Sequence, residues 1–340
     1  MKEIKSKKKL GFFKKIFIKI CRVLGYELID QVFLEFPVSD KKSNDILSVP
    51  GKKSFSLGVG EFPVTRKVQG IDIIVKTCTS VQLVTQNKKR IFEKEKSEYT
   101  FRTLNSLYRS ALDLKKKFPN IFIQFTIIDI GSNEINKNKL STFFNNFPFK
   151  FINLDEKKID MEPMTINKNN KIIEKNMATT MKSIYESFEH AQKCKDLVYF
   201  VEDDYIHKTE ALAEMVFAYE KFSSIFNREL FILSTDYPYL YKKLESSNIL
   251  VGENYHWRTV KECLLTFLTS NQMLKKHYEK LYDMAKNESN PFEKNLHEIF
   301  DNELCLSPLP SLSIHCSNAN SVFGLSPNID IKKIWEDNEY

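Results

Sequence analysis

The sequence LVYFVEDD, residues 197–204, decides the fold of this chain, because five apolar residues run directly into three carboxylates. An apolar run rich in valine and aromatic residues is typical of a strand buried on both faces of a mostly parallel sheet. Ligands of open α/β sheets bind outside the carboxyl ends of such strands. Three adjacent acids repel one another unless a cation or good solvation neutralises them. The stretch therefore predicts a divalent-metal site for a phosphorylated ligand, or else a strand that stops in a solvated acidic turn.

Strand and helix patterns alternate on both sides of this stretch. The predicted strands are 71–77, 121–130, 149–154, 197–201, 229–234, 248–252 and 257–269, followed by an extended segment over 304–312. The predicted helices are 98–117, 177–192, 209–224, 270–285 and 291–302. Such alternation favours a layered α/β domain with a parallel central sheet.

Composition and charge restrict the class of protein. With 28% charged and 42% hydrophobic residues, the 340-residue chain has the composition of a soluble globular protein. The net charge is +7, and residues 1–20, with eight lysines and one acid, account for this excess. A general nucleic-acid binder would spread basic residues over its folded surface, so no nucleic acid is expected as a partner. The six cysteines form no CxxC pair and are typical of reduced thiols in a cytosolic protein.

The first 60 residues predict a basic N-terminal helical extension and a linker, ahead of one domain over 61–335. Phe13, Ile16, Phe17 and Ile20 share one face of a helix, and lysines interrupt every apolar run. Neither a secretory signal nor a membrane-spanning helix fits that pattern. A basic amphipathic helix suits an anionic membrane surface. The alternative is a terminal helix docked on its own domain behind a lysine tail.

Three common site motifs are absent from the sequence. There is no GxxxxGK[ST] segment, so a P-loop is excluded. Pro63 occupies the third glycine position after the GVG at 58–60, which excludes a dinucleotide fingerprint. Cys305, His315 and Cys316 lack the spacing and the fourth ligand of a zinc site.

The order of motifs resembles that of GT-A fold glycosyltransferases, a DxD-containing, family-2-like bacterial group that uses nucleotide sugars. The resemblance covers residues 70–330 and rests on the segments FVEDDYIH, DYPYLY, HWRTV, SLSIH and GLSP. It implies a Rossmann-type layered domain with a mostly parallel central sheet. In this reading residues 61–207 form the nucleotide-binding half and residues 208–335 the acceptor half.

The resemblance also implies a metal centre. Asp204 and His315 would bind Mn²⁺ or Mg²⁺, while Glu202 and Asp203 would contact metal-bound water or the donor sugar and ribose. A hard cation neutralises the charge that develops on a leaving diphosphate and acts as a Lewis acid. An added imidazole ligand favours Mn²⁺ over Mg²⁺.

The donor nucleotide would lie against the ends of the first two strands. There the resemblance places Thr77 and Asp129, with Asp129 accepting a hydrogen bond from the base. Lys76 and Arg102 would face the phosphates. The alternatives are that Thr77 only ends a strand and that Arg102 lies on a solvated helix face.

Two acids are candidates for the base that an inverting transfer requires. The resemblance places this base at the start of a helix, where Glu293 stands, although the usual glycine-rich xED motif is absent. Glu293 could equally be an acid favoured by the helix dipole. Asp236 is the competing base. Trp257 and Arg258 could stack on and clamp an acceptor sugar, whereas the alternative places Trp257 in the core.

Together these features predict a metal-dependent glycosyltransferase of the hexosyltransferase type. It would move a sugar from a nucleoside-diphosphate sugar to a glycan or lipid-linked acceptor in cell-envelope polysaccharide synthesis. The location would be cytoplasmic, peripheral at the inner face of the membrane. A non-catalytic nucleotide-sugar or glycan-binding module is the main alternative. A metal-dependent nuclease or phosphotransferase is disfavoured, because it would need a second metal and a basic groove.

Overall fold

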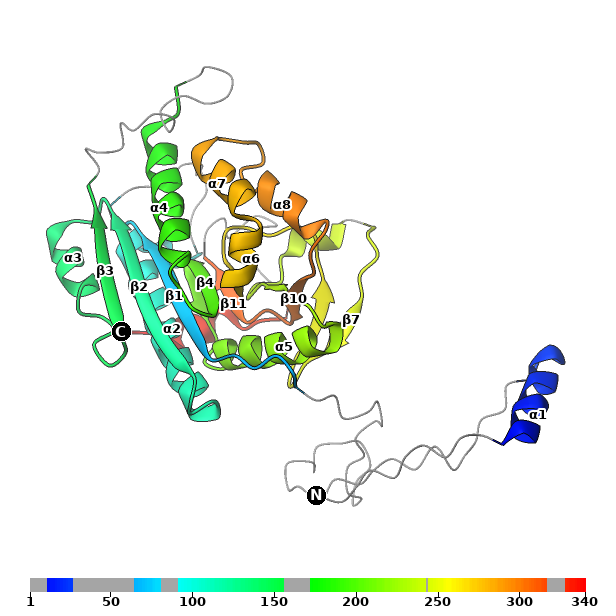
Figure 1. Ribbon diagram of the computed structural model, residues 1–340. Helices are drawn as coiled ribbons and strands as arrows, with labels where there is room; N and C mark the ends of the chain where they lie inside the picture. The colour runs from blue at the N-terminus through cyan, green and yellow to red at the C-terminus, as the bar shows by residue number, and fades with distance from the viewer. Residues whose placement is uncertain (1–10, 27–63, 81–90, 156–171, 243, 317–327) are drawn as a thin grey trace. The chain divides into compact units, whose positions relative to one another are not determined.

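The computed structural model describes residues 11–26, 64–80, 91–155, 172–242, 244–316 and 328–340 (Figure 1). The chain divides into two compact units, Met1–Phe62 and Pro63–Tyr340. In the first unit the described part centres on one helix, α1 (Phe12–Val23), none of whose residues is buried. Among the described residues, every helix is too short or too polar to cross a bilayer.

A nine-stranded sheet forms the centre of the second unit, in the order β3-β2-β1-β4-β9-β6-β10-β8-β7. Its strands are β1 (Gly70–Thr77), β2 (Phe122–Ile130), β3 (Phe149–Leu154), β4 (Leu197–Glu202), β6 (Phe231–Ile232), β7 (Ile249–Val251), β8 (His256–Thr259), β9 (Phe267–Ser270) and β10 (Cys305–Leu309). The pairings show that β8 and β9 run against the other seven strands. This confirms the α/β fold with a mostly parallel central sheet.

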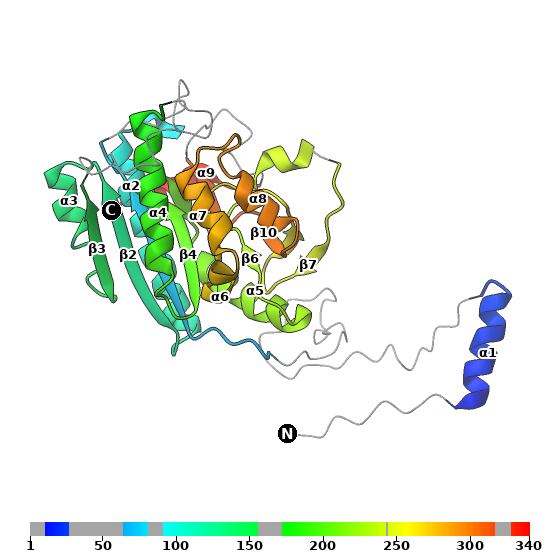
Figure 2. The same ribbon diagram turned by 45° about the horizontal axis from the view of Figure 1, so that its top comes forward.

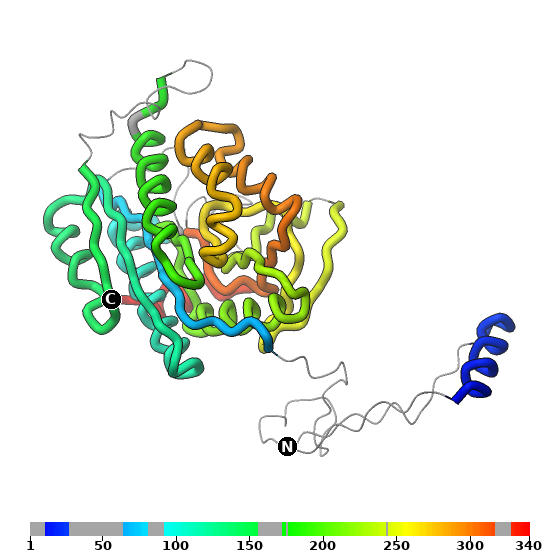
Figure 3. The backbone as a smooth tube through the Cα atoms, viewed as in Figure 1, coloured from blue at the N-terminus to red at the C-terminus, as the bar shows by residue number. Residues whose placement is uncertain are grey.

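The strand at 197–202 lies in the middle of the parallel part, as its apolar run predicted. β1 pairs with β2 on one side and with β4 on the other. Every residue of β1 is buried, and so are the first five residues of β4. Figure 3 follows the chain from β1, in blue, to the C-terminal segments, in red. Because the three strands are parallel and in register, their carboxyl ends meet at one edge of the sheet.

Helices cover the sheet on both faces (Figures 1 and 2). They are α2 (Lys96–Lys117), α3 (Glu134–Leu140), α4 (Lys175–Ala191), α5 (Ala211–Phe226), α6 (Asn271–Lys276), α7 (Tyr278–Lys286), α8 (Lys294–Phe300) and α9 (Ile331–Asp337). α4 packs on β1 and β2 and also contacts α6 and α7, while α2 packs against α5. A second, two-stranded sheet pairs β5 (Tyr205–His207) with β11 (Ser313–His315) in antiparallel register.

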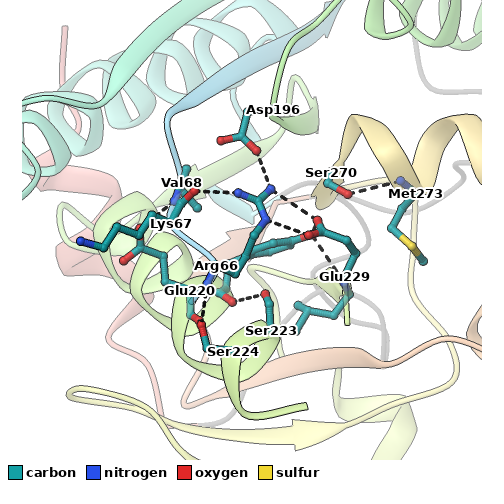
Figure 4. A network of polar contacts seen from close by, with 12 residues as sticks. Arg66, Lys67, Val68, Asp196, Glu220, Ser223, Ser224, Glu229, Ser270 and Met273 are labelled. Carbon is teal, nitrogen blue, oxygen red and sulfur yellow. Dashed lines mark hydrogen bonds and ion pairs between the residues drawn. The ribbon is translucent and has the colours of Figure 1, made fainter. Parts of the chain in front are cut away.

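An arginine fixes the segment that precedes β1 (Figure 4). Arg66 places Nη2 2.5 Å from Asp196 and Nε 2.7 Å from Glu229. The next residues are held as well, since Glu220 accepts a 2.7 Å hydrogen bond from the backbone N–H of Val68. The segment before β1 is thereby tied to the loops that precede β4 and β6.

Several predicted boundaries in the second half were wrong. The strand predicted over 257–269 is two strands, β8 and β9, because β8 pairs with β10 whereas β9 pairs with β4 and β6. The helix predicted over 270–285 is interrupted at His277, which separates α6 from α7. Of the strand predicted over 229–234, only Phe231–Ile232 pairs with neighbouring strands.

Candidate active site

The ends of β1 and β2 are joined through a buried carboxylate. Asp129 is fully buried, and its Oδ1 accepts hydrogen bonds from Thr77 at 2.7 Å and from Ser132 at 2.6 Å. Burial raises the pKa of Asp129, while these two hydroxyls oppose the rise. Its Oδ2 has no hydrogen-bond partner among the described residues. Leaving a buried acceptor unsatisfied costs about 1–3 kcal/mol. Because the side chain is 0% exposed, the predicted contact of Asp129 with a nucleobase stays a prediction.

The middle acid of the triplet binds to the protein itself. Oδ2 of Asp203 accepts hydrogen bonds from the Cys78 backbone N–H and the Thr100 hydroxyl, both at 3.0 Å. The ammonium of Lys96 lies 3.4 Å from the same oxygen. These contacts give Asp203 a structural role that the sequence did not predict. Its contact with the donor remains a prediction.

The third acid faces the predicted histidine. Asp204 Oδ2 lies 3.4 Å from His315 Nε2, and each side chain is 9% exposed. The imidazole stacks on the ring of Tyr205, with centroids 4.5 Å apart and planes 11° apart. Tyr205 and Tyr237 share a 2.7 Å hydrogen bond between their hydroxyls. Pairing of β5 with β11 thus brings the two predicted metal ligands together.

The donor set fits a divalent cation that also binds phosphate and water. A carboxylate oxygen and an imidazole nitrogen converge at Asp204 and His315, which suits Mn²⁺ or Mg²⁺. Within the part of the chain that the structure describes, no three His, Cys, Asp or Glu residues group to hold a metal. Mg²⁺ sites commonly use one or two carboxylates and fill the remaining positions with water and phosphate.

Two further predicted residues and a candidate base meet beside this pair. Lys76 Nζ lies 3.4 Å from Glu202 Oε1, at the ends of β1 and β4. Glu293 stands at the N-cap position of α8. Burial raises the pKa of Glu293 to about 7; the charge of Glu202 adds to the rise, whereas Lys76 and His315 oppose it. The carboxyl of Glu293 is thus influenced by the charges of three predicted site residues.

Arg102 binds other parts of the protein. Its Nε lies 2.7 Å from Glu98, and Nη1 donates a 2.5 Å hydrogen bond to the carbonyl of Trp335. The guanidinium also lies 4.3 Å from the centroid of the Trp335 ring. These contacts attach α9 to α2. The structure therefore gives Arg102 an anchoring role in place of the predicted phosphate contact.

The predicted acceptor residues are separated by the two faces of β8. Trp257 is fully buried and packs against Phe222 and Gly252, so it offers no ring face to a sugar. The alternative that places Trp257 in the core is therefore correct. Arg258 forms an ion pair with Asp236 at 2.7 Å. Since Asp236 is 1% exposed and pairs with Arg258, the structure does not present it as a free base.

The sequence did not predict the residues that support the site. They are Cys78, Lys96, Thr100, Ser132, Tyr205 and Tyr237. Tyr205 and Tyr237 each follow an acidic residue at the end of a strand, and this position was the only feature of the sequence that could have pointed to them. Lys96 and Thr100 lie in the first turns of α2, a helix with a buried face and an exposed face, so no local pattern distinguishes them.

No protein-family model matches the sequence, and no curated protein matches it. Among solved structures, S. aureus TarS 1–349 is 12% identical, with a TM-score of 0.38 over 70% of this chain and 57% of that one. The galactosyltransferase LgtC, in complex with donor and acceptor sugar analogues, is 12% identical, with a TM-score of 0.32 over 68% and 67%. A UDP-glucose pyrophosphorylase complexed with UDP-glucose is 9% identical, with a TM-score of 0.40 over 75% and 96%. The chain spans less than two thirds of the TarS chains, so function rests on the residues of the site itself.

Proposed function

We propose that this protein is a metal-dependent glycosyltransferase that moves a sugar from a nucleoside-diphosphate sugar to an acceptor hydroxyl. One observation carries the proposal. The Asp204–His315 pair, 3.4 Å apart, acts electrostatically on the carboxyl of Glu293, because the charge of His315 lowers the pKa of Glu293, which burial raises to about 7. The first can hold the cation of a diphosphate, and the second can accept a proton near neutral pH.

The donor side of the site uses the ends of β1 and β2. Thr77 and Asp129 join these strand ends through a 2.7 Å hydrogen bond, and Asp129 shapes the donor side from below the surface because its side chain is fully buried. Lys76, at the end of β1, adds positive charge near the diphosphate. Asp204 and His315 would hold Mn²⁺ or Mg²⁺, and such an ion, when bound, neutralises the leaving diphosphate as a Lewis acid.

The acceptor side uses Glu293. The bond from the anomeric carbon to the diphosphate oxygen breaks, and a bond from that carbon to the acceptor oxygen forms on the opposite face. The carboxylate of Glu293 takes the proton of the acceptor hydroxyl. A base is most effective when its pKa lies near the working pH, which suits the value of about 7. This route inverts the configuration of the sugar.

A thermal stability measurement tests the proposal. Ligands that bind the native state raise the unfolding midpoint, so nucleoside diphosphates and nucleotide sugars are tested with and without Mn²⁺. We expect a rise with nucleotide that requires metal and disappears in Asp204→Asn. Asp301→Asn, an exposed acid next to α8, is the matched control and should respond as wild type. If no nucleotide shifts the midpoint of the folded protein, the proposal is wrong.

The base is tested separately from donor binding. We expect Glu293→Gln to keep the nucleotide-dependent rise and to lose transfer by about 10²–10⁴-fold, the usual contribution of a general base. A variant that binds the donor and still transfers at the wild-type rate would reject Glu293 as the base. Wild-type protein that binds nucleotide sugars but never turns them over would favour the binding-module alternative.

We also propose that the enzyme acts at the cytoplasmic face of a membrane, on a lipid-linked or membrane-presented glycan acceptor. Phe13, Ile16, Phe17 and Ile20 lie on one face of α1, and their side chains are exposed by 85%, 41%, 60% and 51%. Lys14, Lys15, Lys19 and Arg22 lie outside that face. An apolar face with flanking cations is the pattern of a helix that lies in an anionic lipid interface.

A further inference from the structure

A cavity of about 320 Å³ lies between the 3₁₀-helix η5 (Pro238–Lys242) and the strands β8 and β10. Its polar lining includes Tyr241, Glu245, Ser247, Arg258, Thr259 and Glu303. The lining comes from the second half of the chain, whereas the predicted donor residues come from the ends of β1, β2 and β4. This cavity is therefore distinct from the donor site.

A buried arginine brings unused hydrogen-bond donors to the cavity. Arg258 is 8% exposed, and both its Nε and its Nη2 donate to Oδ1 of Asp236, at 3.1 and 2.7 Å. The other oxygen of Asp236 accepts a hydrogen bond from the Tyr241 hydroxyl. A guanidinium carries five N–H donors. Within the described residues nothing accepts from Nη1 of Arg258, so this nitrogen can donate to a ligand.

An aromatic ring covers the same arginine and keeps one face open. The ring of Tyr241 lies 4.2 Å from the guanidinium carbon of Arg258, and the side chain is 53% exposed. The hydroxyl, bonded to Asp236, fixes the ring in this position. A flat, partly apolar ring beside hydrogen-bond donors matches a pyranose, which has C–H groups on its faces and hydroxyls around its edge.

The two buried charged residues of the cavity lining, Arg258 and Glu303, are already paired within the protein. Arg258 is neutralised by Asp236, and Glu303 by Lys276, whose Nζ lies 2.6 Å away. A phosphate or a carboxylate would therefore gain little from Arg258 and would meet the carboxylate of Glu303. A neutral ligand with many hydroxyls would find both donors and acceptors.

We propose that this cavity binds a neutral sugar unit of the acceptor glycan. The acceptor role rests on the proposed transferase function.

The test uses the full-length protein and a panel of neutral mono- and disaccharides, with inorganic phosphate as the competing probe. Binding is measured by saturation-transfer NMR. We expect one or more sugars to bind, and Tyr241→Ala to weaken that binding by about tenfold or more. Tyr241→Phe keeps the ring and should retain most of the affinity. Tyr340→Ala is the matched control. It removes an exposed tyrosine that contacts Glu98 and does not line the cavity.

The outcomes separate this inference from the proposed function. If nucleotide and Mn²⁺ still stabilise the protein but no sugar binds, or if Tyr241→Ala binds sugars as wild type, the sugar site is wrong and the transferase proposal stands. Phosphate binding that depends on Arg258 and excludes sugars would also overturn the inference. If sugars bind through Tyr241 but no nucleotide binds, the sugar site stands and the transferase proposal fails.

Discussion

The ammonium of Lys96 lies 3.4 Å from Oδ2 of Asp203, and this ion pair fastens the middle acid of the triplet to α2. Burial lowers the pKa of Lys96, but the combined attraction of the surrounding groups, led by Asp203, outweighs burial and the pKa lies above its usual value. The neighbouring acids have other partners, since Glu202 faces Lys76 and Asp204 faces His315. Of the three adjacent carboxylates, Asp203 thus has a structural role, whereas Glu202 and Asp204 remain candidates for the chemistry.

This division predicts a stability defect at Asp203. Asp203→Ala leaves the ammonium of Lys96, whose side chain is 12% exposed, without its closest partner. Removing one member of a buried ion pair typically costs about 3–5 kcal/mol, so urea unfolding should show a loss of that size. Lys96→Met in the same background should recover part of it. The comparison is Glu202→Ala, whose partly exposed pair should cost about 1 kcal/mol or less. Equal losses in the two single variants would contradict this role for Asp203.

The central part of the fold could be predicted because its signal is local. An unbroken apolar run with acids at its end indicates a buried strand, and parallel strands bring their carboxyl ends to one edge. Thr77, Asp129 and Glu202 therefore come together as expected. Asp204 and His315 also meet, but through the pairing of two three-residue strands far apart in the chain. Strands that short leave no periodicity, so the resemblance alone suggested this contact.

The errors arise where burial depends on distant segments. Arg102 follows a helical pattern, and nothing near it shows that the carbonyl of Trp335 will accept its hydrogen bond. Trp257 and Arg258 are adjacent in a strand, so their side chains must point to opposite faces. The sequence does not show which face packs against α5, and the structure gives that face to Trp257.

From the raised pKa of Glu293 we expect opposite effects of pH on activity and on stability. Its pKa is about 7 in the folded protein, above the ordinary value of 4.5, so the native state binds more protons than the unfolded state between these values. The stabilising effect is complete below pH 4.5 and is lost as pH rises through about 7. Transfer requires the ionised base, so kcat/KM should rise with pH and level off above about 7.

Substitution at Glu293 separates these two effects. At pH 8, the free energy of unfolding of Glu293→Gln should exceed that of wild type by about 1–3 kcal/mol, because the variant buries no charge. Its residual activity should lose the wild-type dependence on pH near neutrality. Glu298→Gln, at an exposed position of α8, should change neither property. A Glu293→Gln variant that is less stable than wild type at pH 8 would contradict the raised pKa.

His207 predicts a loss of stability in acid. The side chain is fully buried, Nε2 lies 2.6 Å from the Tyr199 hydroxyl, and burial lowers the pKa to about 3. The unfolded state takes up the proton near pH 6.5 and the native state near pH 3, so stability falls as pH drops through this window. Between pH 7 and pH 5 this one group should remove about 2 kcal/mol.

A variant isolates that contribution from the carboxylates that also titrate in acid. His207→Gln removes the titration, so its free energy of unfolding should fall by about 2 kcal/mol less than that of wild type between pH 7 and pH 5. The comparison is of slopes, so it holds even if the variant is less stable at both pH values. His256→Gln, at an exposed strand position, should keep the wild-type slope. Identical slopes in all three proteins would show that His207 is not the buried neutral group described.

Helix α1 predicts binding to anionic lipid that depends on two separable features. Burying an aromatic side chain contributes about 1.5–3 kcal/mol, and a lysine near an anionic surface contributes about 1 kcal/mol. In vesicle sedimentation, Phe13→Gln/Phe17→Gln should therefore lose about a hundredfold or more in affinity for vesicles with and without anionic lipid. Lys15→Gln/Lys19→Gln should lose about thirtyfold on anionic vesicles only. Ile135→Gln, which removes a 72% exposed apolar side chain from α3, should bind as wild type.

Two outcomes would contradict this role of α1. If both double variants keep wild-type binding, α1 does not hold the protein at the membrane. If only the lysine variant is impaired, the attraction is electrostatic and the apolar face remains outside the lipid.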